Sequence, residues 1–465
     1  MKKFFKTQPG RFVAALIALV LVVVLTAGAG KPPFLKADVT PQQVMTMDQK
    51  AVDTVKALDQ NVEIYYLASE NGKDLWVYEL VQKYDRMSDH ITLKMIDPAG
   101  DKASELAGMT GSTLAENSLV VVSGDRNIAI AADSLYNVVY NEMYYYYYGE
   151  MVVQEQSFAA DQKLVNALLY VTRDDLPVVY ALTGHGETAA SGMMLTHFQE
   201  SNVLIKPLKL DAAVPEDAAA VMICAPTSDL TASEADALLA YLRQGGDLIL
   251  LTGYTMESRP NLDKVTSYYG MKAENGIVLE MTTGYCYSAE YPQYLTPDVL
   301  EHEVTKNLAG SGVKTVVQLA GAIKHSGIGR SGLKVTELMT TSETAYMKTN
   351  AMMASIAQEE NDLPGKYTVA MAAEDGDTKI TWFMSGAFLS DTDIQVSSGA
   401  NLYVLDGTIR WMMDVIPQEE IVDENLLTAS MNVTSSNLAL VCCLLFVPAL
   451  VVLIAGLVCG RRKKN

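Results

Sequence analysis

The chain has 465 residues, of which 49% are hydrophobic and 19% are charged, and its formal net charge is −20. This composition excludes a disordered or fibrous protein, and the length is enough for two or three domains with real cores. The excess of carboxylates, with no cluster of cations to offset it, argues against nucleic acid as a partner.

Two uncharged apolar stretches, residues 12–30 and 438–459, predict membrane-spanning helices. Each approaches the ~20 residues that a helix needs to cross the hydrocarbon core. A basic tail precedes the first stretch (residues 1–11) and another follows the second (residues 460–465). Cationic flanks of this kind stay in the cytoplasm. The sequence therefore predicts a plasma-membrane protein with both termini cytoplasmic and residues 31–437 extracytoplasmic.

A second interpretation of the first apolar stretch is a cleaved signal peptide. Ala27-Gly28-Ala29 fits a small-x-small cleavage site. The apolar run is longer than the ~7–15 residues of a usual signal h-region, which favours an uncleaved anchor. The sequence leaves both interpretations open.

Residues 37–175 predict a first domain with the order β-α-β followed by β-β-α. Thr46 and Gln49 resemble a capping box that opens a helix before this unit. The expected strands are 61–68, 91–97, 118–124 and 127–132, and the expected helices centre on 77–84 and 160–172. This order is thioredoxin-like. Ser69-Glu70-Asn71-Gly72 occupies the place of a Cys-x-x-Cys motif, so the predicted domain has no redox role.

Residues 176–415 predict a second α/β domain with a doubly wound parallel sheet. Residues 178–187 are expected to form a strand that runs into a glycine-rich turn, and a helix follows it. Further strands are expected at 203–210, 218–226 and 247–253. The helix before the last of these strands has a capping box, Thr231 with Glu234, and ends at Gly245-Gly246. Such a strand-helix-strand crossover with short turns is right-handed, and hence typical of a parallel sheet. A hairpin over 366–386, a helix near 400–415 and a linker over 416–437 complete the prediction.

Cysteine is too sparse for a disulfide framework. Only Cys224 and Cys286 lie outside the second apolar stretch and its end. Cys224 sits in an apolar run, where a buried small hydrophobic residue is a better interpretation than a nucleophile. Whether the two cysteines pair cannot be decided from the sequence.

No motif for nucleotide, metal or covalent chemistry is complete. A Walker motif is absent, and Gly327 to Gly332, which matches G-x-G-x-x-G, is followed by Lys334-Val335-Thr336 instead of a helix. The five histidines are scattered without metal-ligand spacing. The turn after the strand at 247–253, where amidotransferase-like enzymes carry a nucleophilic Cys, contains Thr252-Gly253. The sequence predicts no catalytic residue, no metal site and no cofactor.

The best polar constellation is the turn Gly184-His185-Gly186-Glu187. It follows a predicted strand at the carboxyl end, where open α/β sheets place ligand sites. His beside Glu could bind a metal or shuttle a proton. The alternative is a glycine-permitted turn in which His185 makes a local hydrogen bond. The run Tyr144 to Tyr148 is a further unusual feature, which suits stacking on sugars, packing on a partner or an interdomain contact.

Taken together, these residues resemble the GldG-type auxiliary components of ABC transporters. The resemblance rests on the two terminal spans and on four motifs: VEIYYLA (62–68), LTGHGE (182–187), LLAYLRQGGDLILL (238–251) and His302-Glu303-Val304-Thr305. It implies an envelope-facing subunit that works with a separate permease and ATP-binding subunit, without established catalytic residues.

Two functional hypotheses follow. The first is a non-catalytic, membrane-anchored auxiliary subunit of an ABC transport system, whose partners are the permease, the ATP-binding subunit, the lipid bilayer and an envelope ligand. The second is an envelope hydrolase or ligand-binding enzyme that uses His185 and Glu187. The transported substance and the oligomeric state are not encoded in any recognisable pattern.

Overall fold

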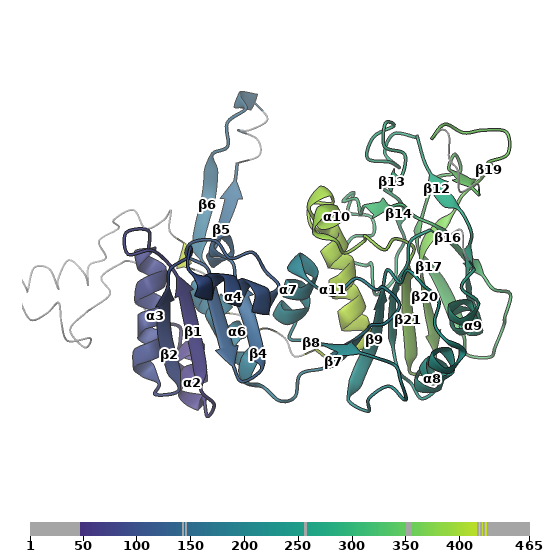
Figure 1. The fold of residues 1–465 in the computed structure, drawn as a ribbon. Helices are drawn as coiled ribbons and strands as arrows, with labels where there is room; N and C mark the ends of the chain where they lie inside the picture. Colours follow the sequence, from purple (N-terminus) through teal and green to yellow (C-terminus); the bar gives the residue numbers. More distant parts are fainter. Residues whose placement is uncertain are drawn as a thin grey trace, which may run out of the picture.

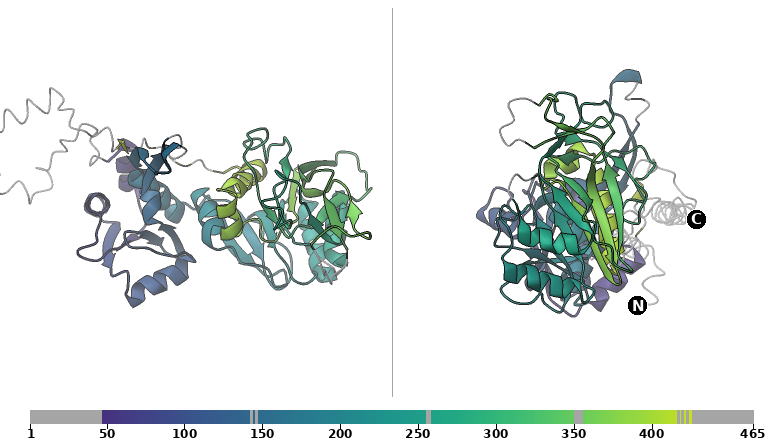
Figure 2. Two further views of the ribbon diagram at one scale, coloured as in Figure 1. Left: turned by 90° about the horizontal axis from the view of Figure 1, so that it is seen from above. Right: turned by 90° about the vertical axis from the view of Figure 1, so that its right-hand side faces the viewer.

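The computed structural model describes residues 47–141, 144, 147–254, 258–349, 356–415, 418, 421, 424 and 425. The expected membrane spans, 12–30 and 438–459, and both basic tails lie outside these residues. Within the described ranges, none of the helices combines the length and the apolar character that a membrane crossing requires. The described chain is a mixed α/β protein, as the sequence predicts, and it forms two domains that lie side by side (Figures 1 and 2).

The first domain is built on a four-stranded sheet with the order β2-β1-β3-β4. Its strands are β1 (Val62–Leu67), β2 (Ile91–Ile96), β3 (Leu119–Ser123) and β4 (Arg126–Ile130). β1 runs parallel to β2 and antiparallel to β3, which forms a hairpin with β4. The expected strands are therefore present. β1, β2 and β3 are one residue shorter than predicted at one or both ends, and β4 begins one residue earlier and ends two residues earlier than predicted.

Helices cover both faces of this sheet. They are α2 (Gln49–Ala57), α3 (Leu75–Met87), α4 (Asp101–Thr110) and α6 (Ala160–Thr172). α3 buries its Val77, Leu80, Val81 and Tyr84 face, as its periodicity predicts. The cap of α2 corrects the sequence analysis: Asp48, not Thr46, is the N-cap, and its carboxylate accepts from the Lys50 amide at 2.8 Å.

A two-stranded ribbon projects from the first domain (Figure 1). It consists of β5 (Tyr136–Tyr140), which follows the short 3₁₀ helix η3 (Ala132–Leu135), and β6 (Val153–Phe158), paired antiparallel. A short strand from the far end of the chain, β22 (Glu424–Asn425), pairs with the base of β6. Part of the predicted linker 416–437 thus returns to the first domain, where Ile421 is buried in its core.

The second domain is built on a ten-stranded mixed sheet whose part toward one edge is parallel. Five strands form that part in the order β8-β7-β9-β10-β21: β7 (Val178–Leu182), β8 (Leu204–Leu208), β9 (Ala218–Cys224), β10 (Leu248–Leu251) and β21 (Thr378–Phe383). β9 and β10 are buried along most or all of their length, because helices cover both faces.

One face of this sheet packs against α7 (Gly192–Glu200) and α11 (Ala400–Met412), and the other against α8 (Ala232–Leu242) and α9 (Pro260–Tyr268). Successive side chains of each strand point to opposite faces of the sheet and enter two separate cores. Ile249 and Leu251 face α7 and α11, whereas Leu248 and Leu250 face α8 and α9. α10 (Asp391–Val396) precedes α11 and caps the amino end of α7 through Asp391.

The remaining strands extend the sheet on the side of β21. β20 (Thr368–Asp375) pairs antiparallel with β21 as the predicted hairpin, and β11 (Met271–Glu274), β14 (Asp298–Val299), β16 (Ala322–His325) and β17 (Lys334–Thr340) continue it. Two small sheets complete the domain. One consists of β12 (Ile277–Leu279), β18 (Tyr346–Lys348) and β19 (Leu363–Pro364), and the other of β13 (Tyr294–Leu295) and β15 (Val317–Gln318).

The two domains are in contact at α6 and α7. Lys163 of the first domain forms an ion pair of 2.6 Å with Glu200 of the second, and Gln199 donates to the Asn127 carbonyl at 3.1 Å. The G-x-G-x-x-G stretch lies between β16 and β17, so a strand follows it, as expected for a loop that is not a dinucleotide site.

The capping box of α8 gives a first prediction. The Thr231 hydroxyl accepts from the Glu234 amide at 3.2 Å, and the Glu234 carboxylate accepts from the Thr231 amide at 2.7 Å. Thr231→Ala is expected to lower the free energy of unfolding by about 1 kcal/mol in denaturant titrations. The matched control is Ser191→Ala, because Ser191 is the N-cap of α7 but makes no capping hydrogen bond with its side chain. Equal losses in both variants would contradict the prediction.

Asp247, at the start of β10, gives a pH-dependent prediction. Burial raises its pKa to about 7, although its carboxylate accepts from the Lys379 amide at 2.7 Å. The folded state therefore holds a proton that the unfolded state has already lost, so stability declines as pH rises from about 4 to 7. The slope from one such group is at most about 1.4 kcal/mol per pH unit. Denaturant titrations across this pH range should show that the free energy of unfolding declines less for Asp247→Asn than for the wild type. Parallel pH profiles of the two proteins would refute this prediction.

Candidate functional site

The turn predicted as the candidate site follows β7, at the carboxyl end of the parallel strands. Gly184 and Gly186 have φ values of 122° and 76°, which L-residues rarely adopt. A Cβ on Gly186 would also lie 2.0 Å from the Thr227 hydroxyl. Both glycines are therefore required by the path of the chain, and between them they turn the His185 side chain into the protein.

His185 is held between two carboxylates. Its Nδ1 lies 2.9 Å from Glu187 Oε1, and its Nε2 lies 3.0 Å from Glu234 Oε2. The Glu187 carboxylate also accepts from the His185 amide at 2.7 Å. The His185, Glu187 and Glu234 side chains are only 8%, 3% and 16% exposed. We call this group the histidine clamp.

The clamp favours a charged imidazolium. Burial acts to lower the pKa of His185, but the hydrogen bonds that the ring donates to Glu187 and Glu234 outweigh it and raise the pKa above its usual value. Burial acts to raise the pKa of Glu234, yet hydrogen bonds from Thr231 and His185 hold it below the usual range. With both ring nitrogens donating to carboxylates, the imidazole has no lone pair left for a metal or a substrate proton in this arrangement.

The backbone around the clamp is tied to the loop after β9. The His185 carbonyl accepts from the Thr227 amide at 2.8 Å and from its hydroxyl at 3.0 Å. The Thr188 amide donates to the Cys224 carbonyl at 2.9 Å. These bonds join the ends of β7 and β9, and Glu234 adds the start of α8. The turn thus connects three elements of the second domain.

The sequence analysis identified two of the three side chains of the histidine clamp, His185 and Glu187. Gly184, His185, Gly186 and Glu187 are contiguous, whereas Glu234 was recognised only as the partner of Thr231 in the capping box. The missing signal is topological: β7 and β9 are neighbours in the sheet, so the start of α8, a few residues after β9, returns to the end of β7.

The two cysteines considered in the sequence are both buried and free. Burial raises the pKa of Cys224 to about 11, which keeps the thiol protonated, and burial also raises the pKa of Cys286. After β10, the Thr252 hydroxyl is buried and accepts from the Trp382 indole N–H at 2.8 Å. None of these three side chains, Cys224, Cys286 and Thr252, is an activated nucleophile.

Outside the clamp, the His302 Nε2 lies 4.0 Å from Glu374 Oε1. In the part of the chain that the structure describes, no group of three or more His, Cys, Asp or Glu residues is placed to hold a metal ion. His302, in the His302-Glu303-Val304-Thr305 motif, packs edge-on against Trp411 with ring centroids 5.0 Å apart. That motif therefore anchors α11 against the segment that precedes β15.

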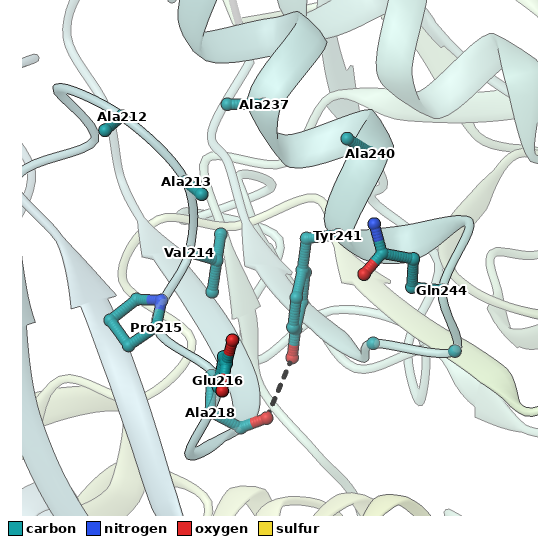
Figure 3. A pocket seen from close by; sticks show the side chains of 12 residues that line it. Ala212, Ala213, Val214, Pro215, Glu216, Ala218, Ala237, Ala240, Tyr241 and Gln244 are labelled. Carbon is teal, nitrogen blue, oxygen red and sulfur yellow. Dashed lines mark hydrogen bonds between the residues drawn. The ribbon is translucent and has the colours of Figure 1, made fainter.

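A pocket of about 520 Å³ lies elsewhere, between α8 and the loop that leads into β9 (Figure 3). Tyr241 forms one wall, and its hydroxyl donates to the Ala218 carbonyl at 3.4 Å. Much of the remaining wall is alanine, from Ala212 and Ala213 on the loop and from Ala237 and Ala240 on α8. The pocket lies at the amino ends of β9 and β10, whereas the histidine clamp lies at the carboxyl end of β7.

Of the tyrosine run, the described residues Tyr144, Tyr147 and Tyr148 lie at the tip of the β5–β6 ribbon, not at the clamp. Tyr147 and Tyr148 are 66% and 69% exposed. The rings of Tyr144 and Tyr148 pack against each other with centroids 4.6 Å apart. These three tyrosines therefore contribute to a protruding surface, whereas the interdomain contacts involve α6, α7 and β4.

Comparison with known proteins finds a family model that matches the second domain. The parallel sheet with helices on both faces defines an α/β domain whose glycine turn is closed by ion pairs. The family described as "ABC-type uncharacterized transport system" matches this domain over residues 176–380. The match confirms, for this part of the chain, the resemblance to the GldG-type ABC transporter auxiliary proteins. No curated protein gives a significant match to the chain.

Solved structures show only distant likeness. The mmIFT52 N-terminal domain is 18% identical, with a TM-score of 0.38, over 50% of this chain and 96% of that domain. A cytoplasmic protein from Salmonella typhimurium is 13% identical, with a TM-score of 0.32, over 51% of this chain and 98% of that protein. The carbohydrate deacetylase Agd3 is 13% identical, with a TM-score of 0.26, over 50% of this chain and 32% of that enzyme. Likeness at these TM-scores bears on neither function nor mechanism.

Proposed function

We propose that the protein is a non-catalytic, membrane-anchored auxiliary subunit of an ABC transport system. The observation that carries the proposal is the family match over residues 176–380. In this proposal a separate permease and ATP-binding subunit supply transport and energy, and the two α/β domains face outward. The apolar stretches 12–30 and 438–459 anchor the chain in the plasma membrane, with cytoplasmic tails and residues 31–437 extracytoplasmic.

The fold types belong to the same proposal. The strand order β2-β1-β3-β4, with β1 parallel to β2 and antiparallel to β3, supports a thioredoxin-like first domain. The parallel order β8-β7-β9-β10-β21, with helices on both faces, supports a doubly wound, amidotransferase-like second domain. The saturated hydrogen bonding of His185 supports a structural role for its turn, in place of a catalytic one.

The proposal is tested by purifying the full-length protein from its own membranes in mild detergent and identifying the proteins that accompany it by mass spectrometry. We expect an ABC permease and an ATP-binding subunit in amounts comparable to the bait. Recovery of the bait without either protein would refute the proposal. Protease protection of intact cells tests the topology separately, because the region 31–437 should then be cleaved from outside.

The alternative function, an envelope hydrolase or ligand-binding enzyme, requires the histidine clamp to open. For His185 to act as a base or ligand, one ring nitrogen must leave its carboxylate and reach a substrate. Turnover or ligand binding that disappears in His185→Ala, while the variant remains folded, would favour the alternative over the proposal.

A further inference from the structure

The ribbon formed by β5, β6 and the described residues between them, which we call the arm, projects away from both domains (Figure 1). Its base is firmly held. The Tyr136 hydroxyl donates to Asp74 at 2.6 Å, and the Phe158 ring packs against Tyr136 and Trp76 with centroids 5.2 and 6.1 Å apart. The base of the arm is therefore packed firmly against the first domain.

Beyond the base, the arm exposes apolar side chains on both of its faces. The exposed residues are Val138, Val139, Tyr140, Tyr144, Tyr147, Tyr148, Met151, Val152 and Val153. Neighbouring residues of a strand point to opposite faces, so Val138 and Val139 make both faces apolar on β5, as Val152 and Val153 do on the other side. A ribbon with two apolar faces suits a groove that encloses it better than a flat surface that covers one face.

The edge of the arm is also open. Among the described strands, β6 lies between β22 and β5, and β5 has no neighbour on its outer side. An exposed apolar edge strand is a template for pairing with an added strand. Exposed tyrosines add large amphipathic contact area at a low entropic cost, as at other protein interfaces.

Charge decides between possible occupants. No Lys or Arg occurs between Arg126 and Lys163, whereas Glu150 and Glu155 are exposed on the arm. Two copies of such an arm repel each other, and an anionic lipid surface repels it as well. A protein groove with an apolar floor and a Lys or Arg rim is complementary to it.

We propose that the arm docks into an apolar, basic-rimmed groove on the outer face of the permease. This inference rests on the proposed function. The base of the arm pairs with β22, and Asn425 precedes the expected span at Leu438 by 13 positions (438 minus 425). A chain segment of that length reaches at most ~45 Å, which keeps the arm close to proteins of the same membrane.

The test is site-specific photo-crosslinking of the full-length protein in its own membranes. Benzoylphenylalanine replaces Tyr148 on the arm or, as a control of similar exposure (62%), Tyr287 in the second domain. We expect an adduct between position 148 and the permease that co-purifies with the wild type, and no such adduct from position 287. Adducts to lipid alone, adducts to a second copy, or equal yields at both positions would each overturn the inference.

A second measurement compares permease recovery by variants. Tyr148→Ser combined with Met151→Ser should reduce recovery about tenfold, as loss of a central contact does. The control Tyr287→Ser should not change it, and thermal unfolding should show that all variants are folded. If the wild type recovers no permease, the proposed function fails together with this inference. If the wild type and the arm variant recover it equally, only the docking of the arm is wrong.

Discussion

Replacing His185 with alanine is expected to lower the free energy of unfolding by about 3 kcal/mol. The substitution removes the cation between Glu187 and Glu234 and leaves two poorly exposed carboxylates facing an empty space. Breaking a buried charge pair by removing one partner is among the most costly single changes, because the remaining charge keeps its desolvation penalty. Guanidinium titrations followed by tryptophan fluorescence measure the loss, since Trp382 is buried in the second domain.

Two further variants separate the clamp from a general loss of packing. His325→Ala removes an exposed imidazole from β16, so its stability should stay within about 0.5 kcal/mol of the wild type. Adding Glu187→Gln and Glu234→Gln to His185→Ala should recover part of the loss, because neutral amides replace the unpaired charges. A His185→Ala variant as stable as the wild type would show that the carboxylates do not depend on the imidazolium.

The same clamp sets a pH dependence of known sign. The folded-state pKa of His185 is raised above its ordinary 6.5 by the two carboxylates, against the effect of burial. Its contribution to stability is therefore fully present below about pH 6.5 and is lost as pH rises through the folded-state pKa. The stability difference between wild type and His185→Ala should accordingly shrink on the alkaline side.

Elements with a repeated local signal were predictable from the sequence. The capping box and the apolar stripe define α8 within a few residues, because both are set by neighbours three or four positions apart. The hairpin of β20 and β21 is marked by Asp375-Gly376-Asp377, and Gly376 adopts the positive φ that such a turn needs. The turn after β7 was predictable in the same way, because its two glycines are a local signal in the sequence.

Features that depend on distant partners were not predictable. The carboxylate of Glu234 serves a local cap and a histidine 49 positions away, and only the second role requires the sheet order. The arm has apolar residues on both faces, so its pattern resembles neither a half-buried strand nor a helix. β22 is two residues long, and its pairing with β6 is set by the fold alone.

Gly407, in the middle of α11, is a position where a single added methyl group should be costly. A Cβ there would lie 2.0 Å from the Val304 carbonyl oxygen and 2.7 Å from its carbon. Both are backbone atoms, so no side-chain rotation relieves the contact, and α11 would have to move away from the segment that His302 and Trp411 hold against it. Gly407→Ala is therefore expected to lower the free energy of unfolding by about 2–3 kcal/mol, despite the ~1 kcal/mol by which alanine favours a helix over glycine.

Gly108 in α4 provides the matched control, because it is an exposed helical glycine with no atom within 4 Å of an added Cβ. Gly108→Ala should raise the free energy of unfolding by about 0.5–1 kcal/mol through helix propensity alone. Thermal and denaturant unfolding of the two variants should thus move in opposite directions from the wild type. If both variants were stabilised, α11 would not pack on the Val304 backbone at the distance described, and the close approach of these two elements would be wrong.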